Sequence, residues 1–226
     1  MDEVLIVLLI TNLIAIAFGL TFMRRTLRIL PKYITEEDNY LTEIAKRGGL
    51  LFLGDSLIQF YDTNAFFSGE LTHNRGVSGN TVSQVTERLE TSVYPVRPDK
   101  IFILAGTNDL NKKAQPQEVF ESIAGVCALI AQNLPDTATN VISLLPVNPK
   151  AGRLARIVVG KRNNEDIRSV NALLRPYCEK NNLGYIDAHS ALCDTQGNLN
   201  AVYSLDGLHI NFKGYKKLTE LVRKYI

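Results

Sequence analysis

The residue types that could carry nucleophilic chemistry in this chain begin with Ser56, which follows an apolar run through Gly54 and Asp55. Gly54 permits a tight turn, and a serine at the start of a helix feels a positive dipole that favours an attacking alkoxide. A serine nucleophile also needs a base, and His209 is the best histidine for that role. Asp206 precedes His209 by three residues, so its carboxylate could hold Nδ1 and leave Nε2 to take the Ser56 proton.

The tetrahedral intermediate of acyl transfer needs hydrogen-bond donors for its oxyanion. The backbone N–H groups of Ser56 and Gly79 and the side-chain amide of Asn108 could provide three donors. Gly79 lacks a Cβ atom, so backbone and substrate could approach each other closely. Asp109 follows Asn108 directly. With Gly54 and Asp55, it is expected to support the site, although its segment also reads as an Asx turn.

A rival acid–base pair is formed by Asp187 and His189, because two-residue spacing in an extended chain points both side chains to one face. The remaining histidine, His73, falls in a weak strand candidate. The chain has no HExxH or C-x-x-C motif, and Gly160-Lys161-Arg162 lacks the earlier glycine and the Ser/Thr of a phosphate-binding loop. We therefore expect neither a metal ion nor an organic cofactor.

Alternating strands and helices are expected to position these residues. Amphipathic stretches of helical length separate short apolar runs, which predicts right-handed βαβ crossovers and a parallel sheet covered on both faces. Five strands would suit a three-layer, flavodoxin-like order, with the ligand crevice beyond the strands' carboxyl ends. The predicted strands cover 49–53, 71–75 (the weakest), 101–105, 141–145 and 184–187, and the predicted helices cover 34–48, 81–93, 117–134, 164–182 and 211–225.

Composition fits one such domain with an appendage. The chain has 226 residues, of which 46% are hydrophobic and 21% charged, which excludes disordered and repetitive classes. Basic and acidic residues are equal in number beyond residue 32, so a nucleic-acid partner is not expected. Three scattered cysteines, Cys127, Cys178 and Cys193, fit reduced, mostly buried thiols better than a disulfide framework.

The N-terminal segment 4–23 carries no charge and is long enough, as a helix, to cross a bilayer. Positive charges at 24–32 follow it, so the positive-inside rule predicts a single-pass anchor with a cytoplasmic catalytic domain. A cleaved signal peptide ending near Ala15-Ile16-Ala17 is the alternative, with a secreted or extracytoplasmic enzyme. The predicted division is an anchor with its basic segment at 1–32 and one domain at 33–226.

Four segments occur in order over residues 49–212: Gly-Asp-Ser-Leu at 54–57, Gly-x-Ser-Gly-x-Thr at 76–81, Gly-x-Asn-Asp at 106–109 and Asp-x-x-His at 206–209. Together they resemble the SGNH (GDSL) hydrolase family. The resemblance implies Ser56 as nucleophile, Gly79 and Asn108 as oxyanion donors, and His209 with Asp206 as base and orienter. It implies a three-layer α/β fold and favours His209 over His189.

The family includes esterases, lysophospholipases and carbohydrate O-acetylesterases, so the resemblance implies a serine ester hydrolase without naming a substrate. An acyltransferase using the same chemistry and a non-catalytic, membrane-tethered binding protein are the alternatives. The expected partners are a small-molecule or lipid ester and the membrane. Apolar residues at 57–67 could line an acyl pocket or form core, and the stretch 146–163, with five cations, could form a wall over the site or an ordinary loop.

Overall fold

The computed structural model describes residues 40–226, and the chain divides into two units, 1–44 and 45–226. Residues 40–43 are helical. The predicted membrane anchor, its basic flank and the signal-peptide alternative all lie outside the described residues. Within the described part of the chain, no helix is both long and apolar enough to span a membrane.

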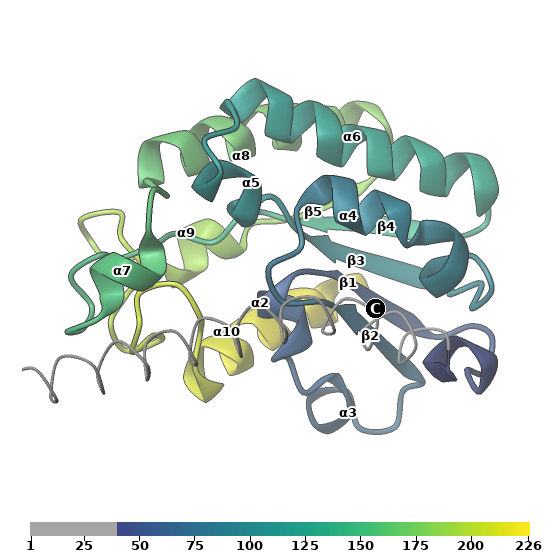
Figure 1. Cartoon of the computed structure of the whole chain (residues 1–226). Helices are drawn as coiled ribbons and strands as arrows, with labels where there is room; N and C mark the ends of the chain where they lie inside the picture. The colour runs from purple at the N-terminus through teal and green to yellow at the C-terminus, as the bar shows by residue number, and fades with distance from the viewer. Residues whose placement is uncertain (1–39) are drawn as a thin grey trace, which may run out of the picture. The chain divides into compact units, whose positions relative to one another are not determined.

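Five parallel strands form the central sheet of the second unit, in the order β2-β1-β3-β4-β5 (Figure 1). This is the flavodoxin-like order predicted from the sequence, and both edges carry a strand with one neighbour. Because all strands run in one direction, their carboxyl ends share one edge. The strands are β1 (Leu50–Gly54), β2 (Thr72–Gly76), β3 (Lys100–Leu104), β4 (Ala138–Ile142) and β5 (Gly184–Ile186).

Alternation along the strands builds a separate apolar core on each face of the sheet. Leu51 and Leu53 of β1 pack in one core, under α4 (Val82–Glu87), a π-helical turn (Leu89–Val93), α6 (Pro116–Asn133) and α8 (Asn164–Lys180). Leu50 and Phe52 point into the other core. The helices of that face are α2 (Ser56–Gln59), α3 (Thr63–Phe66), α9 (Ala188–Leu192) and α10 (Phe212–Val222), which ends in a 3-10 turn (Arg223–Tyr225). Figure 1 shows α6 and α8 on one side of the sheet and α10 on the other.

Two predicted boundaries were wrong. The helix predicted at 34–48 does not continue past residue 44. Within the remainder of that range and directly after it, Gly48 and Gly49 adopt positive φ angles of 89° and 77°. The strand predicted at 141–145 lies at 138–142. It stops there because the backbone N–H and C=O of Leu144 bond the side chain of Asn171, at 2.8 and 2.9 Å, in place of a neighbouring strand.

Short helices also occupy segments outside the predicted helix ranges, although a helix was expected to begin at Ser56. They are α2, α3, α5 (Thr107–Asn111), α7 (Ala155–Val159) and α9. Each has four or five residues, too few for a periodic apolar pattern to be recognised. All of them except α3 follow the carboxyl end of a strand, and α2 and α5 carry predicted site residues.

Candidate active site

Ser56 is the first residue of α2, immediately beyond the carboxyl end of β1. Asp55 caps this helix, and its Oδ1 accepts a hydrogen bond of 2.9 Å from the backbone N–H of Leu57. Gly54 does not have the turn role that the sequence suggested, because it is the last residue of β1. A Cβ atom on it would lie 2.0 Å from the carbonyl oxygen of Leu104, so Gly54 permits close contact between β1 and β3.

The predicted nucleophile, base and acid lie in one hydrogen-bonded line. Ser56 Oγ is 3.0 Å from His209 Nε2, and His209 Nδ1 is 2.7 Å from Asp206 Oδ2. An ionised carboxylate can only accept hydrogen bonds, so this contact places the imidazole proton on Nδ1 and leaves Nε2 able to accept the Ser56 proton. Residues separated by 153 positions in the sequence thus meet at one edge of the sheet.

The Asp206 carboxylate is held in place by its own loop. Its Oδ1 accepts hydrogen bonds from the backbone N–H groups of Leu208 and His209, at 2.9 and 2.8 Å. Partial burial alone would raise the pKa of Asp206, but the bonds from the His209 side chain and these two N–H groups outweigh burial and lower it. The acid therefore stays ionised and faces the imidazole at neutral pH.

Two of the predicted oxyanion donors have unoccupied backbone N–H groups. Neither Ser56 N nor Gly79 N donates a hydrogen bond to any other residue of the described structure. Gly79 has a φ of 80°, and a Cβ atom there would meet nothing within 4 Å. The left-handed backbone conformation therefore explains why a glycine occupies position 79, and the space where a side chain would lie is open.

Asn108 is oriented from both ends of its side-chain amide. Its Nδ2 donates to the carbonyl oxygen of Asn80 at 2.9 Å and lies 3.5 Å from Asp55 Oδ2. Its Oδ1 accepts a hydrogen bond of 2.7 Å from Nη2 of Arg162. Asn108 thereby joins the loop that follows β2 to the segment after α7.

Arg162 is a site residue that the sequence interpretation missed. Its side chain is buried, and its guanidinium also bonds Thr107, through the carbonyl at 2.9 Å and the hydroxyl at 3.1 Å. The carbonyls of Val158 and Val159 accept from Nη1 at 3.2 and 3.0 Å. Nothing in the sequence around Gly160-Lys161-Arg162 distinguishes this arginine from the exposed cations beside it.

Asp55 is a fully buried carboxylate next to Ser56, and Asp109 is a partly buried carboxylate next to Asn108. Burial raises the pKa of Asp55 to about 7, with a further rise from Asp109 and opposing effects from the Leu57 N–H and the Arg162 charge. Burial also raises the pKa of Asp109, whose carboxylate accepts from the backbone N–H of Val82 at 3.1 and 3.3 Å. Asp109 thus ties α5 to the start of α4.

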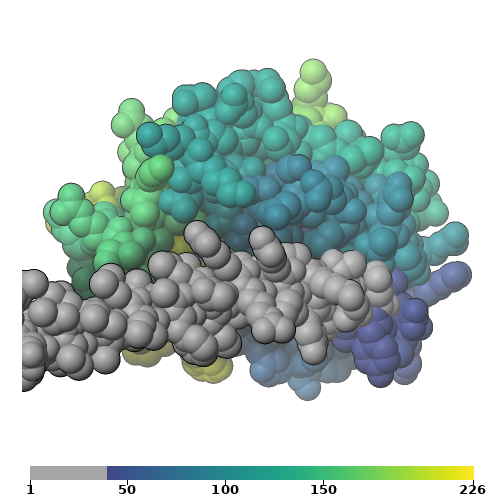
Figure 2. Space-filling view, viewed as in Figure 1, coloured from purple at the N-terminus to yellow at the C-terminus, as the bar shows by residue number. Residues whose placement is uncertain are grey.

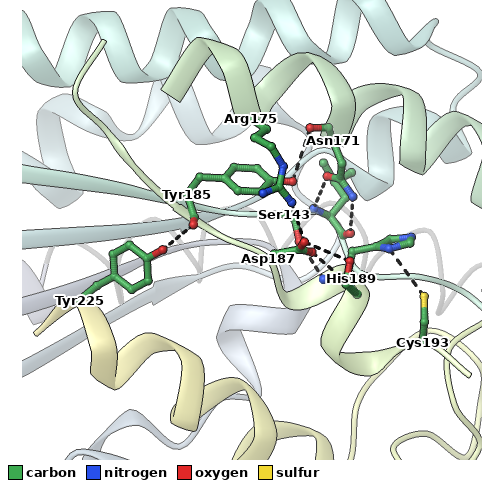
Figure 3. A network of polar contacts seen from close by, with 10 residues as sticks. Ser143, Asn171, Arg175, Tyr185, Asp187, His189, Cys193 and Tyr225 are labelled. Carbon is green, nitrogen blue, oxygen red and sulfur yellow. Dashed lines mark hydrogen bonds and ion pairs between the residues drawn. The ribbon is translucent and has the colours of Figure 1, made fainter. Parts of the chain in front are cut away.

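The rival pair does not form a second site of the same kind. The Asp187 carboxylate bonds Arg175 at 2.6 Å and the backbone and hydroxyl of Ser190, both at 3.0 Å. His189 Nδ1 lies 3.6 Å from Cys193 Sγ, and its Nε2 is buried without a hydrogen-bond partner among the described residues. Figure 3 shows the imidazole of His189 turned toward Cys193 and away from the contacts of Asp187.

The other histidine and the three cysteines lie outside the line formed by Ser56, His209 and Asp206. His73 Nε2 is 3.0 Å from the carbonyl oxygen of Gly48. No disulfide joins Cys127, Cys178 and Cys193, of which the first two are buried. Reduced, mostly buried thiols were predicted, and this is confirmed.

Most of the apolar residues that follow Ser56 belong to the core. Leu57, Ile58, Tyr61 and Phe67 are each at most 2% exposed. Phe66 is partly buried. Phe60 is 55% exposed, and its ring centroid lies 5.4 Å from that of His209. One aromatic side chain of this segment therefore borders the reacting groups, and most of the others belong to the core.

The stretch 146–163 lies against the loop that carries Asp206 and His209. The backbone N–H of Asn148 donates to the carbonyl oxygen of Gly207 at 2.8 Å. A Cβ atom on Gly207 would lie 2.0 Å from the Asn148 carbonyl oxygen and 3.3 Å from Ala155 Cβ, so a larger residue would separate these segments. The sequence left open whether 146–163 forms a wall beside the site, and the structure places it there.

Several solved structures have the same fold as this chain. A Streptococcus pneumonia protein named for platelet activating factor is 27% identical, with a TM-score of 0.83 over 92% of this chain and 98% of the other. A catalytic mutant of an acetylxylan esterase from Geobacillus stearothermophilus is 16% identical, with a TM-score of 0.59 over 80% of this chain and 94% of the other. At that lower identity the likeness shows the fold alone.

Sequence relatives include a much longer protein. An N-acylneuraminate cytidylyltransferase from Escherichia coli is 27% identical over 179 residues, which are 78% of this chain and 40% of that protein. The chain therefore spans less than half of this relative's length. The GDSL-like Lipase/Acylhydrolase family matches residues 52–217, a range that contains all four segments of the site. The chain belongs to the GDSL-like lipase/acylhydrolase family of ester-hydrolysing enzymes.

Proposed function

We propose that the chain hydrolyses a carboxylic ester through an acyl-enzyme on Ser56. The observation that carries this proposal is the line from Ser56 Oγ through His209 to Asp206, with contacts of 3.0 and 2.7 Å. The chemistry needs no metal ion or organic cofactor, because the chain supplies nucleophile, base and oxyanion donors itself.

In the first half-reaction, Ser56 Oγ attacks the ester carbonyl while its proton passes to His209 Nε2. Asp206 stabilises the imidazolium that forms. The carbonyl oxygen becomes an oxyanion that accepts from the unoccupied N–H groups of Ser56 and Gly79 and from the Asn108 amide. Collapse of this intermediate breaks the bond to the alkoxy oxygen, which takes the proton from His209 and leaves as the alcohol.

In the second half-reaction, water attacks the acyl-enzyme. His209 Nε2 takes a proton from the water, and the new tetrahedral intermediate collapses to release the carboxylic acid. The proton on Nε2 returns to Ser56 Oγ. The His209 side chain is 29% exposed, so solvent water can reach the base.

Activity toward p-nitrophenyl esters from acetyl to dodecanoyl tests this proposal. The full-length wild type should hydrolyse at least one of them, and Ser56→Ala should lose that activity. The preferred chain length separates an O-acetylesterase from a lipid hydrolase. Undiminished hydrolysis by the alanine variant would exclude Ser56 as the nucleophile, and a wild type inactive on every ester would favour a non-catalytic binding protein or a transferase.

A further inference from the structure

Several exposed apolar side chains lie on the segments that carry or contact the candidate active site. Leu205, directly before Asp206, is 82% exposed, and Phe212, three residues after His209, is 71% exposed. Such side chains are costly to leave in water when they gather in one place. We call this group the apolar rim and define it as Phe60, Leu154, Ile157, Val202, Leu205 and Phe212.

Contacts between their segments hold the rim residues near one another. A Cβ atom on Gly152 would lie 2.5 Å from the carbonyl oxygen of Leu205, which places the segment before α7 directly on the catalytic loop. The side-chain amide of Asn211 donates to the carbonyl of Val202 at 3.0 Å. Phe212 follows Asn211 directly, as the first residue of α10.

Two rim residues lie on helix α7 and its N-cap, Leu154, because the buried face of the helix is opposite. Ala155 and Val159, one helical turn apart, are at most 1% exposed, whereas Leu154 and Ile157 are 64% and 77% exposed. This pattern leaves an apolar stripe pointing outward. The green atoms of the α7 segment form part of the visible surface in the space-filling view (Figure 2).

Positive charge accompanies the rim. No acidic residue occurs between Asp136 and Glu165, and Asp206 is the only acidic residue from 195 to 219. The exposed cations of these two stretches are Lys150, Arg153, Arg156, Lys161, Lys213 and Lys216. Apolar side chains flanked by lysine and arginine are the composition of surfaces that bind anionic bilayers.

We propose that the apolar rim docks the active-site entrance onto an anionic lipid surface, from which the enzyme takes an amphiphilic ester. The inference deepens the proposed function and rests on it. A second copy of the chain is a poorer occupant. A twofold contact through this face would bring two copies of the same cationic surface together, and like charges would oppose each other.

The absence of tryptophan from the chain allows a direct test of rim insertion. In the full chain, Ile157→Trp places a single reporter on the rim, and Leu129→Trp places one on α6, where Leu129 is 36% exposed. Both variants are mixed with phosphatidylcholine vesicles, with and without phosphatidylglycerol. Because the readout compares two positions in one chain, a difference between them reports contact at the rim and not attachment through another part of the chain.

The expected result is a blue shift and quenching by brominated lipid at position 157, stronger with phosphatidylglycerol and absent at position 129. Equal responses at the two positions, or none at 157, would overturn the inference. A concentration-dependent blue shift at 157 without vesicles would also overturn it, because it would identify a second copy as the occupant.

Turnover separates this inference from the proposed function. Ile157→Ser should lower hydrolysis of a long-chain ester in vesicles about tenfold or more, since an isoleucine side chain no longer leaves water, and leave hydrolysis of a soluble acetyl ester unchanged. Equal loss on both substrates would contradict rim docking. If the side chain at position 157 inserted into vesicles while the wild type hydrolysed neither ester, the result would contradict the proposed function and support the docking surface.

Discussion

The amide oxygen of Asn108 accepts a hydrogen bond of 2.7 Å from the guanidinium of Arg162. This contact fixes the orientation of the amide, because a flipped amide would present its NH₂ to a guanidinium that has only donors. The Nδ2 end is thereby directed toward Asn80 and Asp55. A buried arginine thus orients a proposed oxyanion donor from behind.

Replacing Arg162 should slow turnover more than it weakens substrate binding. For Arg162→Met we expect kcat on a soluble ester to fall roughly tenfold, less than for loss of the donor itself, with KM little changed. Lys161→Met is the matched control, because Lys161 is exposed and contributes only its backbone N–H to Asn111. Steady-state kinetics of folded variants would contradict this role if KM rose and kcat stayed constant.

Removing the amide itself tests the oxyanion assignment. Asn108→Ala should lower kcat by a factor on the order of 10²–10³, as for other single oxyanion donors. Asn111→Ala, on the same helix, should keep wild-type kcat, because its side chain bonds only the Lys161 backbone N–H in the described structure. An unchanged kcat for Asn108→Ala would remove this residue from the oxyanion hole.

Two aspartates distinguish the catalytic pair from its rival. Asp206→Asn should lower kcat by roughly 10⁴, because an amide no longer holds the imidazole in the required tautomer. Asp187→Asn should leave kcat unchanged, since Asp187 bonds Arg175 and Ser190 and not a ring nitrogen of His189. Comparing kcat of the two variants at neutral pH decides the assignment, and the reverse order would return it to Asp187 and His189.

Asp55 should make the folded state less stable as pH rises. Its pKa is raised from 3.8 to about 7 by burial, so the unfolded chain loses this proton first and stability falls across that interval. Asp55→Asn keeps an acceptor for Leu57 and should gain stability over the wild type as pH rises through the interval. Urea unfolding at about pH 5 and pH 8 measures this, with exposed Asp136→Asn as the control. An advantage independent of pH would contradict the raised pKa.

The sequence predicted the sheet order because the apolar strands alternate with long amphipathic helices. Residue types and spacing made Ser56, Asp206 and His209 candidates, and the resemblance of the four ordered segments to a known family favoured His209 over His189. Gly54 was expected to permit a tight turn, but glycine is required there because the carbonyl oxygen of Leu104 in β3, distant in sequence, leaves no room for a Cβ atom. Arg162 could not be predicted, because a buried arginine and an exposed one differ only in tertiary packing. The bounds of the short helices were not predicted, because four or five residues are too few to show a full apolar period.

Covalent labelling of Ser56 tests the central claim most directly. The full-length protein is treated with a fluorophosphonate, and the modified residue is located by mass spectrometry, with Ser56→Ala as the control. We expect one adduct, on Ser56, whose formation is slowed by ester substrate and which is absent from the alanine variant. An adduct on another residue, or an unmodified Ser56 in a protein that hydrolyses esters, would contradict the claim.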